Sequence, residues 1–220
     1  RTAGWRSRAV DSQKVLFGTP TLEHLVCGIR LEAVPEASFR PNLLLLDALC
    51  QAVIDLSGVS PQDVVWDSFC GQGPFSQLLA KRCGHLVAFD RSEPALAALQ
   101  RNLEACNVSE RAQCIRIDLG SPAELRCLTE SLPEIDSFHS SRDDSNENAF
   151  DDDIDALDED DTREASTDLH YDGGKQPMPS FGRLAAPDIL VADPGRNGLP
   201  KAFRRFLYNL RVRTIVLIGS

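Results

Sequence analysis

The segment Val64–Asp90 constrains the fold of this chain more than any other. Two short apolar runs in it, Val64–Trp66 and Leu86–Phe89, are typical of buried parallel strands. Between them, Phe75–Arg82 carries apolar residues at helical spacing. Because two glycines stand shortly after the first run, the pattern predicts a strand, a glycine turn, a helix and a second strand.

The glycine turn has the chemistry of a nucleotide site. Gly71 and Gly73 let bare backbone N–H groups approach a ligand at a helix N-terminus. Asp90 closes the second strand 23 residues after Asp67, where a carboxylate accepts hydrogen bonds from ribose hydroxyls. Asp67 itself stands at a strand tip, where it would repel a pyrophosphate. S-adenosylmethionine brings an ammonium and a sulfonium instead, so the pattern favours that cofactor over NAD; a purely structural turn is the alternative.

Strands and helices alternate along the rest of the chain. A helix opens at Pro94 after a cap by Ser92 or Glu93, and another follows the capping box Ser121–Glu124, to about Leu132. The other expected elements are helices over Asn42–Leu56 and Pro200–Asn209 and strands over Ala112–Ile117, Asp188–Asp193 and Thr214–Ile218. This alternation predicts an α/β fold with a parallel sheet. Its ligands bind outside the carboxyl ends of the strands, which carry Asp67, Asp90, Asp118 and Asp193.

Two stretches fall outside this alternation. The lead-in has short β-like runs at Val15–Phe17 and Gly28–Val34, so we expect residues 1–40 to end a β-rich substrate domain and residues 41–220 to form the cofactor domain. Over residues 134–183 the few apolar residues show no period, which predicts a disordered acidic insertion. Its expected role is that of a solvated spacer, with an acidic interaction or autoinhibitory segment as the alternative.

The net charge of −10 originates in this insertion. Between Asp136 and Glu164 stand 13 acidic and two basic residues, so the rest of the chain carries 20 acidic and 21 basic ones. Such a balance is compatible with a nucleic-acid partner. From Arg183 to Arg213, seven basic residues accompany two acidic ones, which is equally consistent with a solvated helix face and with a strip that contacts phosphates.

The cysteines and the hydropathy indicate an intracellular protein. The seven cysteines are scattered and contain no C-x-x-C pair, so we expect reduced core residues and no metal site. The chain has no run of 18 apolar residues and no signal peptide, so we expect no membrane partner and no secretion. The compartment inside the cell and the oligomeric state stay open.

Three motifs occur in a particular order and spacing. The first begins at Gly28 and ends in Ser-Phe-Arg-Pro-Asn42, the second is Asp67-Ser-Phe-Cys-Gly-Gln-Gly-Pro-Phe75, and the third is Asp193-Pro-Gly-Arg-Asn-Gly-Leu199. Together they resemble the RNA uracil-5-methyltransferase family, the S-adenosylmethionine-dependent enzymes that make 5-methyluridine in transfer and ribosomal RNA. The resemblance covers Gly18–Ser220 apart from the insertion. It implies a Rossmann-like class I methyltransferase fold and an RNA substrate.

The resemblance also implies a set of site residues. Those for the cofactor are Arg40, Phe69, Gly71, Gly73, Pro74, Asp90 and Asp193, and those for the RNA are Phe39, Asn42 and Arg196. Asp193 would lie beside the methyl-donor end. Three positions depart from the family pattern, which has a Gln at Arg40, a polar residue at Pro74 and a second Pro at Gly195.

Covalent catalysis is the chemistry that the resemblance implies. C5 of uracil is a poor nucleophile, so the family adds a Cys thiolate at C6 and later removes the C5 proton with a Glu. That Cys follows the fifth strand in a Ser-Cys-Asn-Pro turn, whose serine corresponds to Ser220. We therefore expect a fragment with a sheet incomplete at its C-terminus, a catalytic Cys directly after Ser220 and no catalytic residue within the sequence. Cys70, in the cofactor turn, is expected to be a packing residue.

The main hypothesis is therefore a 5-methyluridine methyltransferase of RNA, with transfer RNA ranked above ribosomal RNA as its substrate. A second hypothesis, a non-catalytic RNA- or partner-binding relic, is motivated by the three departures. A third, methylation of nitrogen, ranks last because Arg196 stands where such enzymes have an aromatic residue.

Overall fold

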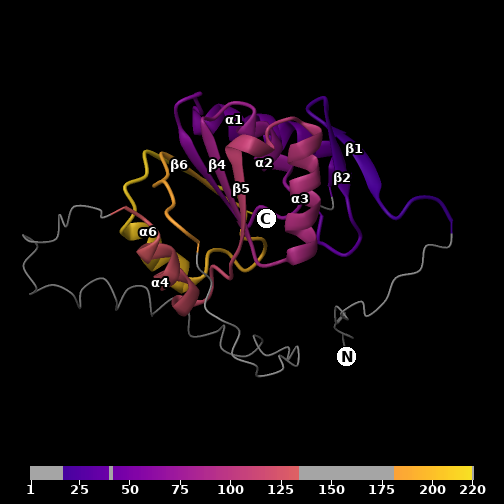
Figure 1. Cartoon of the computed structure of the whole chain (residues 1–220). Helices are drawn as coiled ribbons and strands as arrows, with labels where there is room; N and C mark the ends of the chain where they lie inside the picture. The colour runs from indigo at the N-terminus through magenta and orange to yellow at the C-terminus, as the bar shows by residue number, and fades with distance from the viewer. Residues whose placement is uncertain (1–16, 40–41, 134–180, 220) are drawn as a thin grey trace, which may run out of the picture. The chain divides into compact units, whose positions relative to one another are not determined.

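The computed structural model describes residues 17–39, 42–133 and 181–219 (Figure 1). The strands are β1 (Leu22–Val26), β2 (Ile29–Ala33), β3 (Val64–Ser68), β4 (His85–Asp90), β5 (Ala112–Arg116), β6 (Ile189–Ala192) and β7 (Thr214–Leu217). The helices are α1 (Leu46–Ser57), α2 (Pro74–Ala80), α3 (Glu93–Ala105), α4 (Pro122–Glu130) and α6 (Lys201–Tyr208), with the 3₁₀ helices η1 (Leu43–Leu45) and η2 (Ser109–Arg111). From Val64 onward every expected strand and helix is present, with ends within two residues of those predicted.

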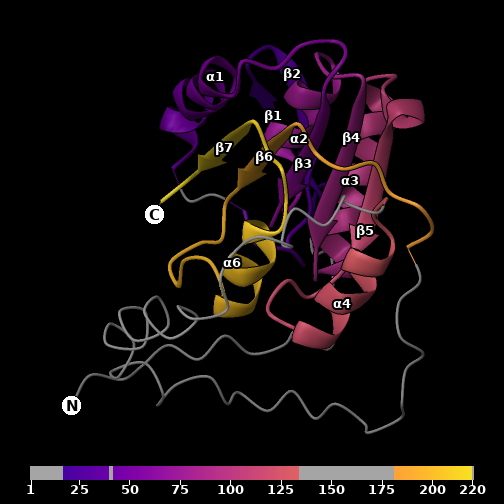
Figure 2. The same ribbon diagram turned by 90° about the vertical axis from the view of Figure 1, so that its left-hand side faces the viewer.

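Five strands form one parallel sheet in the order β5-β4-β3-β6-β7, and Figure 2 shows β7 at one edge and β5 at the other. The central strand β3 pairs with β4 on one side and with β6 on the other, so Trp66 lies between Val87 and Leu190. The chain builds β3, β4 and β5 outward in one direction and then returns to place β6 beside β3. The strand order therefore reverses between β3 and β6, which is where open α/β sheets bind ligands. The prediction of a Rossmann-like α/β sheet is confirmed.

Helices cover both faces of the sheet, with α1, α2 and α3 on one side and α4 and α6 on the other (Figure 1). Consecutive strand residues alternate between the two cores. Val65 packs with the α1–α3 layer, whereas Trp66 packs with the α4–α6 layer, where its ring stacks on Phe206 at 6.4 Å. Burial on both faces explains the apolar runs Val64–Trp66, Leu86–Phe89 and Ile189–Ala192 of the three inner strands.

The predicted helix caps are present, with one difference. Ser92 accepts a hydrogen bond from Ala95 N–H (3.3 Å), and Ser121 accepts one from Glu124 N–H (3.4 Å). The reciprocal half of the capping box is absent, because Ser121 N–H donates to the Asp118 carbonyl instead. The Glu124 carboxylate accepts from Asp118 N–H at 2.9 Å, which ties α4 to the end of β5.

The N-terminal hairpin differs from the prediction. We expected strands at Val15–Phe17 and Gly28–Val34, but the hairpin consists of β1 and β2, in antiparallel register from Leu22↔Ala33 to Val26↔Ile29. Phe17 is fully exposed, and the two residues before it lie outside the described residues. The prediction missed β1 because only its last residue is buried, so it shows no clear alternation. Cys27 and Gly28, with φ of 48° and 74°, form the two-residue turn that sets the register.

The hairpin packs on the α1–α3 side, where Val26, Leu31 and Ala33 belong to the same core as the helices. The expected helix over Asn42–Leu56 starts later, because residues 43–45 form η1 before α1 begins. The division into domains at residue 40 stays a prediction. The predicted disordered acidic insertion over residues 134–183 lies outside the described residues, except for its last three.

Candidate functional site

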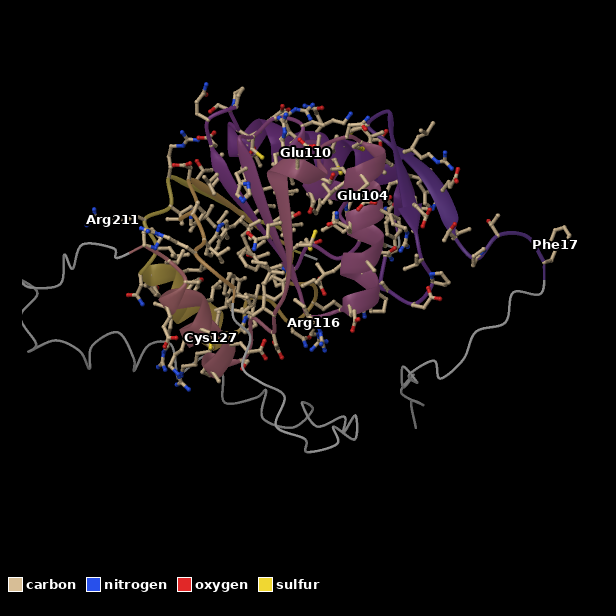
Figure 3. The ribbon with its side chains drawn as sticks, viewed as in Figure 1. Phe17, Glu104, Glu110, Arg116, Cys127 and Arg211 are labelled. Atoms are coloured by element: carbon tan, nitrogen blue, oxygen red, sulfur yellow. The ribbon has the colours of Figure 1, made fainter. Side chains whose placement is uncertain are left out.

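A cavity of about 790 Å³ opens at the carboxyl ends of the parallel strands. Figure 3 gives the direction: Glu110 lies just before β5 and Arg116 at its end, so the strands run toward the lower edge of that view. The glycine turn after β3 and the ends of β4 and β6 contribute to the walls, as does the segment after β2. The lining residues are 36–39, 69–72, 74, 90–92, 95, 117–119, 193–198 and 200.

The turn after β3 depends on three residues with positive φ, namely Phe69 (61°), Gly71 (54°) and Gly73 (87°). Hydrogen bonds from Cys70 N–H to the Phe89 carbonyl and from Gly73 N–H to the Cys70 carbonyl hold it at 3.0 Å each. Phe69 and Gly71 line the cavity. Gly73 does not: it caps α2, and a Cβ there would come within 2.2 Å of Leu99 Cδ1.

Asp90 links the glycine turn to the next helix. One carboxylate oxygen accepts from Gly71 N–H (2.9 Å) and the other from Ser92 N–H (2.8 Å), so the side chain has one orientation at the cavity wall. Each oxygen retains a further lone pair for a ligand hydroxyl. The expected place of Asp90 is therefore compatible with ribose recognition.

Asp67 has a different role from the one expected of it. Its side chain is fully buried, accepts a hydrogen bond from Ser76 Oγ and does not line the cavity. Burial raises the pKa of Asp67 to about 7; the Ser76 hydrogen bond opposes this shift, and the charges of Asp193 and Asp90 add to it. The expectation that the Asp67 carboxylate faces the ligand is wrong, because its side chain is buried inside the protein and does not line the cavity.

Other carboxylates face the cavity instead. Its walls carry Glu36, Asp90, Asp118 and Asp193, against the two arginines Arg91 and Arg196. This excess of negative charge disfavours a pyrophosphate and suits a ligand with a cationic group. Phe69 and Ile117 add apolar surface for a flat ring. The arrangement can hold a nucleoside that carries a positive charge.

The loop after β6 brings Asp193 and Arg196 to the same cavity. Asp193 N–H donates to the Ser68 carbonyl (3.2 Å), which holds the carboxyl ends of β3 and β6 together at the reversal point. Beyond it, Gly195 and Gly198 have φ of 73° and 67°, and Gly198 N–H donates to the Gly195 carbonyl. Gly195 thus occupies a left-handed conformation that Pro cannot adopt.

The cysteine of the turn is a packing residue, as expected. Cys70 is buried in the core of the α1–α3 side, and burial raises the pKa of its thiol well above the ordinary value. A thiol in this state carries little thiolate and is a poor nucleophile. None of the seven cysteines forms a disulfide.

Most of the predicted site residues come together, but not all. Seven line the cavity: Phe39, Phe69, Gly71, Pro74, Asp90, Asp193 and Arg196. Gly73 belongs to the turn but does not line the cavity, Asn42 is exposed and does not line it either, and Arg40 lies outside the described residues. The sequence reasoning missed Gln72 and Asn102, which are almost fully buried and join the turn to β2. The available signal for Gln72 was its place between two glycines, and Asn102 had none.

Within the described ranges, no three His, Cys, Asp or Glu residues gather as a metal site. No described helix has the length and apolarity needed to cross a membrane.

Known proteins with similar sequences give independent information on this chain. No family model matches the chain. An uncharacterized RNA methyltransferase of Listeria innocua is 28% identical over 99 residues, which are 45% of this chain and 22% of that protein. One of Streptococcus mutans is 25% identical over 96 residues, 44% of this chain and 21% of the relative. Over this region the chain is similar to bacterial RNA methyltransferases. The match spans only about a fifth of the length of these methyltransferases.

A solved structure has a similar fold. The tRNA (uracil-54, C5)-methyltransferase of Pyrococcus abyssi, in complex with S-adenosyl-L-homocysteine, superposes with a TM-score of 0.56 at 18% identity. The superposition covers 92% of this chain and 35% of the archaeal enzyme. At this identity the likeness concerns the fold, which agrees with the methyltransferase relatives found by sequence.

Proposed function

We propose that this chain is the cofactor-binding part of an S-adenosylmethionine-dependent enzyme that methylates C5 of a uridine in RNA, with transfer RNA favoured over ribosomal RNA. The observation that carries the proposal is the cavity at the β3–β6 reversal point, into which Asp90 and Asp193 face. The RNA methyltransferase relatives and the fold of the uracil-54 enzyme support it.

The residues of the cavity fit this cofactor. Asp90, oriented by Gly71 N–H and Ser92 N–H, would accept the ribose hydroxyls. Asp193 and Glu36 would face the cationic amino acid end, and Phe69 and Ile117 would border the base. S-adenosylmethionine supplies an electrophilic methyl group when bound. The protein's own part is to orient the cofactor and to exclude water around it.

The nucleophile of the proposed reaction does not lie among the described residues. Uracil C5 becomes nucleophilic only after a thiolate adds to C6, and the buried Cys70 thiol is unsuited to this step. On the resemblance to the uracil-5-methyltransferase family, we propose that the addition is made by a Cys directly after Ser220 and that a Glu further on removes the C5 proton. Arg196, exposed at the rim of the cavity, and Phe39, in its wall, are proposed to contact the RNA.

Two measurements on the full-length protein test the proposal. The first is calorimetric titration with S-adenosylhomocysteine, for which we expect binding. The second is tritium release from transfer RNA labelled at C5 of its uridines, with S-adenosylmethionine as donor. Methylation at C5 expels the label, whereas methylation at nitrogen or at ribose retains it.

The outcomes separate the proposed enzyme from the alternatives. Binding with tritium release supports the C5 methyltransferase. Methyl incorporation into RNA without tritium release contradicts the C5 assignment and keeps the RNA methyltransferase. Cofactor or RNA binding without any methyl transfer favours the non-catalytic relic, for which Pro74 in the cavity wall is the motivating observation.

A further inference from the structure

The side chain of Gln72 binds the backbone of the segment that follows β2. Gln72 lies between the two glycines of the turn, yet it is only 1% exposed. Its Oε1 accepts from Val34 N–H (2.7 Å), and its Nε2 donates to the carbonyls of Val34 (3.1 Å), Ala37 (2.9 Å) and Ser38 (3.2 Å). One amide thus holds the backbone of a segment 34 to 38 residues away in the sequence.

These bonds satisfy backbone groups on the side of β2 that faces away from β1, where no strand among the described residues pairs with it. In a hairpin with a two-residue turn, the backbone N–H and C=O groups of alternate residues face the partner strand. Those of Ile29, Leu31 and Ala33 therefore face β1. The backbone groups of Arg30, Glu32 and Val34 face away from it. Side-chain amides take the place of a neighbouring strand there. Gln77 donates to the Arg30 carbonyl (3.3 Å), and Asn102 binds both Glu32 N–H (2.8 Å) and the Glu32 carbonyl (2.9 Å).

The segment after β2 forms a wall of the cavity. Residues 36–39 line it, and Phe39 stacks on His24 of β1 with ring centroids 5.6 Å apart. Asn102 also donates to the Gln72 backbone carbonyl (3.2 Å), so the turn, α3 and the wall are joined through one pair of amides. The position of the wall relative to the glycine turn, which Asp90 binds, therefore depends on Gln72.

We propose that Gln72 is a positioning residue, which fixes the wall segment 34–39 at the distance from the glycine turn that the cofactor needs. The inference rests on the proposed function, because the ligand is taken to be S-adenosylmethionine. It extends that function by giving the Gln72 side chain a role in shaping the cofactor site. Gln72 borders the cavity itself and also binds Ala37 and Ser38, which line the wall, and Val34 just before them.

The test compares Gln72→Met with Gln77→Met in the full-length protein. The two glutamines are matched, since each is 1% exposed and each binds the backbone at or just after β2, but Gln77 does not line the cavity. Hydrogen–deuterium exchange of the peptide covering residues 34–39 reports the wall, and calorimetry reports the dissociation constant for S-adenosylhomocysteine. We expect faster exchange and about tenfold weaker binding for Gln72→Met, and neither for Gln77→Met.

A purely structural role would lower the unfolding temperature of both variants and leave the dissociation constant as in wild type, which would overturn the proposal. Unchanged exchange at 34–39 in Gln72→Met would also overturn it. Gln72→Glu serves as a second variant if Gln72→Met does not fold. It keeps the size of the side chain but places a carboxylate among three carbonyl oxygens, and the same two changes are expected. If the wild-type protein binds no S-adenosylhomocysteine, the proposed function fails, and the exchange at 34–39 still decides whether Gln72 holds the wall.

Discussion

At the scale of single residues, Gly73 meets a conformational and a steric requirement together. Its φ is 87°, and a Cβ would lie 2.2 Å from Leu99 Cδ1. We predict that Gly73→Ala lowers the free energy of unfolding by about 2–4 kcal/mol, measured by urea denaturation. Gly58→Ala, at φ 59° with open space around it, carries the backbone cost alone and is expected to lose about 1 kcal/mol. Equal losses in the two variants would contradict the steric part.

The buried carboxyl of Asp67 predicts a pH dependence of stability. Its folded-state pKa of about 7 lies above the unfolded value of 3.8, so the folded state binds the proton more tightly. Stability therefore falls as the pH rises from the unfolded pKa to the folded pKa. Asp67→Asn removes the ionisation. We expect the stability of this variant relative to wild type to rise by about 2–3 kcal/mol between pH 5 and pH 8, measured by urea denaturation at each pH. A constant difference across that range would show that Asp67 does not titrate there.

At the scale of elements, the hairpin β1–β2 is attached to the sheet domain through amide side chains more than through strand pairing. The Asn102 side chain in α3 binds both the backbone N–H and the backbone carbonyl of Glu32. Removing this side chain leaves these partly buried groups without that partner. We predict that Asn102→Ala destabilises the protein by about 2–4 kcal/mol and speeds proteolysis within residues 22–39.

The control for this prediction is Gln100→Ala in the same helix, which removes an exposed bond to Glu104. Its effect is expected to stay within about 0.5 kcal/mol. If cleavage within residues 22–39 stays as slow in Asn102→Ala as in wild type, the amide does not hold the hairpin.

At the scale of the whole molecule, the proposed cofactor links parts distant in the sequence, because residues 36–39, 69–72, 90–92 and 193–198 share one cavity. A ligand bound there stabilises the folded state by mass action. At a hundredfold excess over the dissociation constant, S-adenosylhomocysteine is expected to add about 2.7 kcal/mol and to raise the unfolding temperature by several degrees in a thermal scan.

The variant Asp90→Asn is expected to abolish this stabilisation by S-adenosylhomocysteine. The Asn amide has a single acceptor oxygen for these two donors, so either the bond from Gly71 N–H or the bond from Ser92 N–H is lost, and with it the common anchor of the turn and the proposed ribose site. We expect the temperature shift to disappear at the same ligand concentration, whereas Asp55→Asn, on the exposed side of α1, retains it. A full shift in Asp90→Asn would place the ligand elsewhere.

The sequence by itself determined the order of strands and helices from Val64 to Leu217, the glycine turn and the carboxylate at Asp90. These features depend on local periods and on turn chemistry, which a window of ten to twenty residues contains. It also indicated the family, since the RNA methyltransferase relatives agree with the resemblance.

Only the tertiary structure decided which carboxylates face the cavity, where β1 lies, and what Gln72 and Asn102 do. Asp67 and Asp90 both stand near strand ends. Burial raises the pKa of Asp67 against the opposing Ser76 hydrogen bond, whereas two backbone N–H groups hold the Asp90 carboxylate at the cavity wall. Gln72 meets Val34 across 38 residues and Asn102 meets Glu32 across 70. Desolvation and hydrogen bonding act between neighbours in space, and no local pattern in the chain specifies those neighbours.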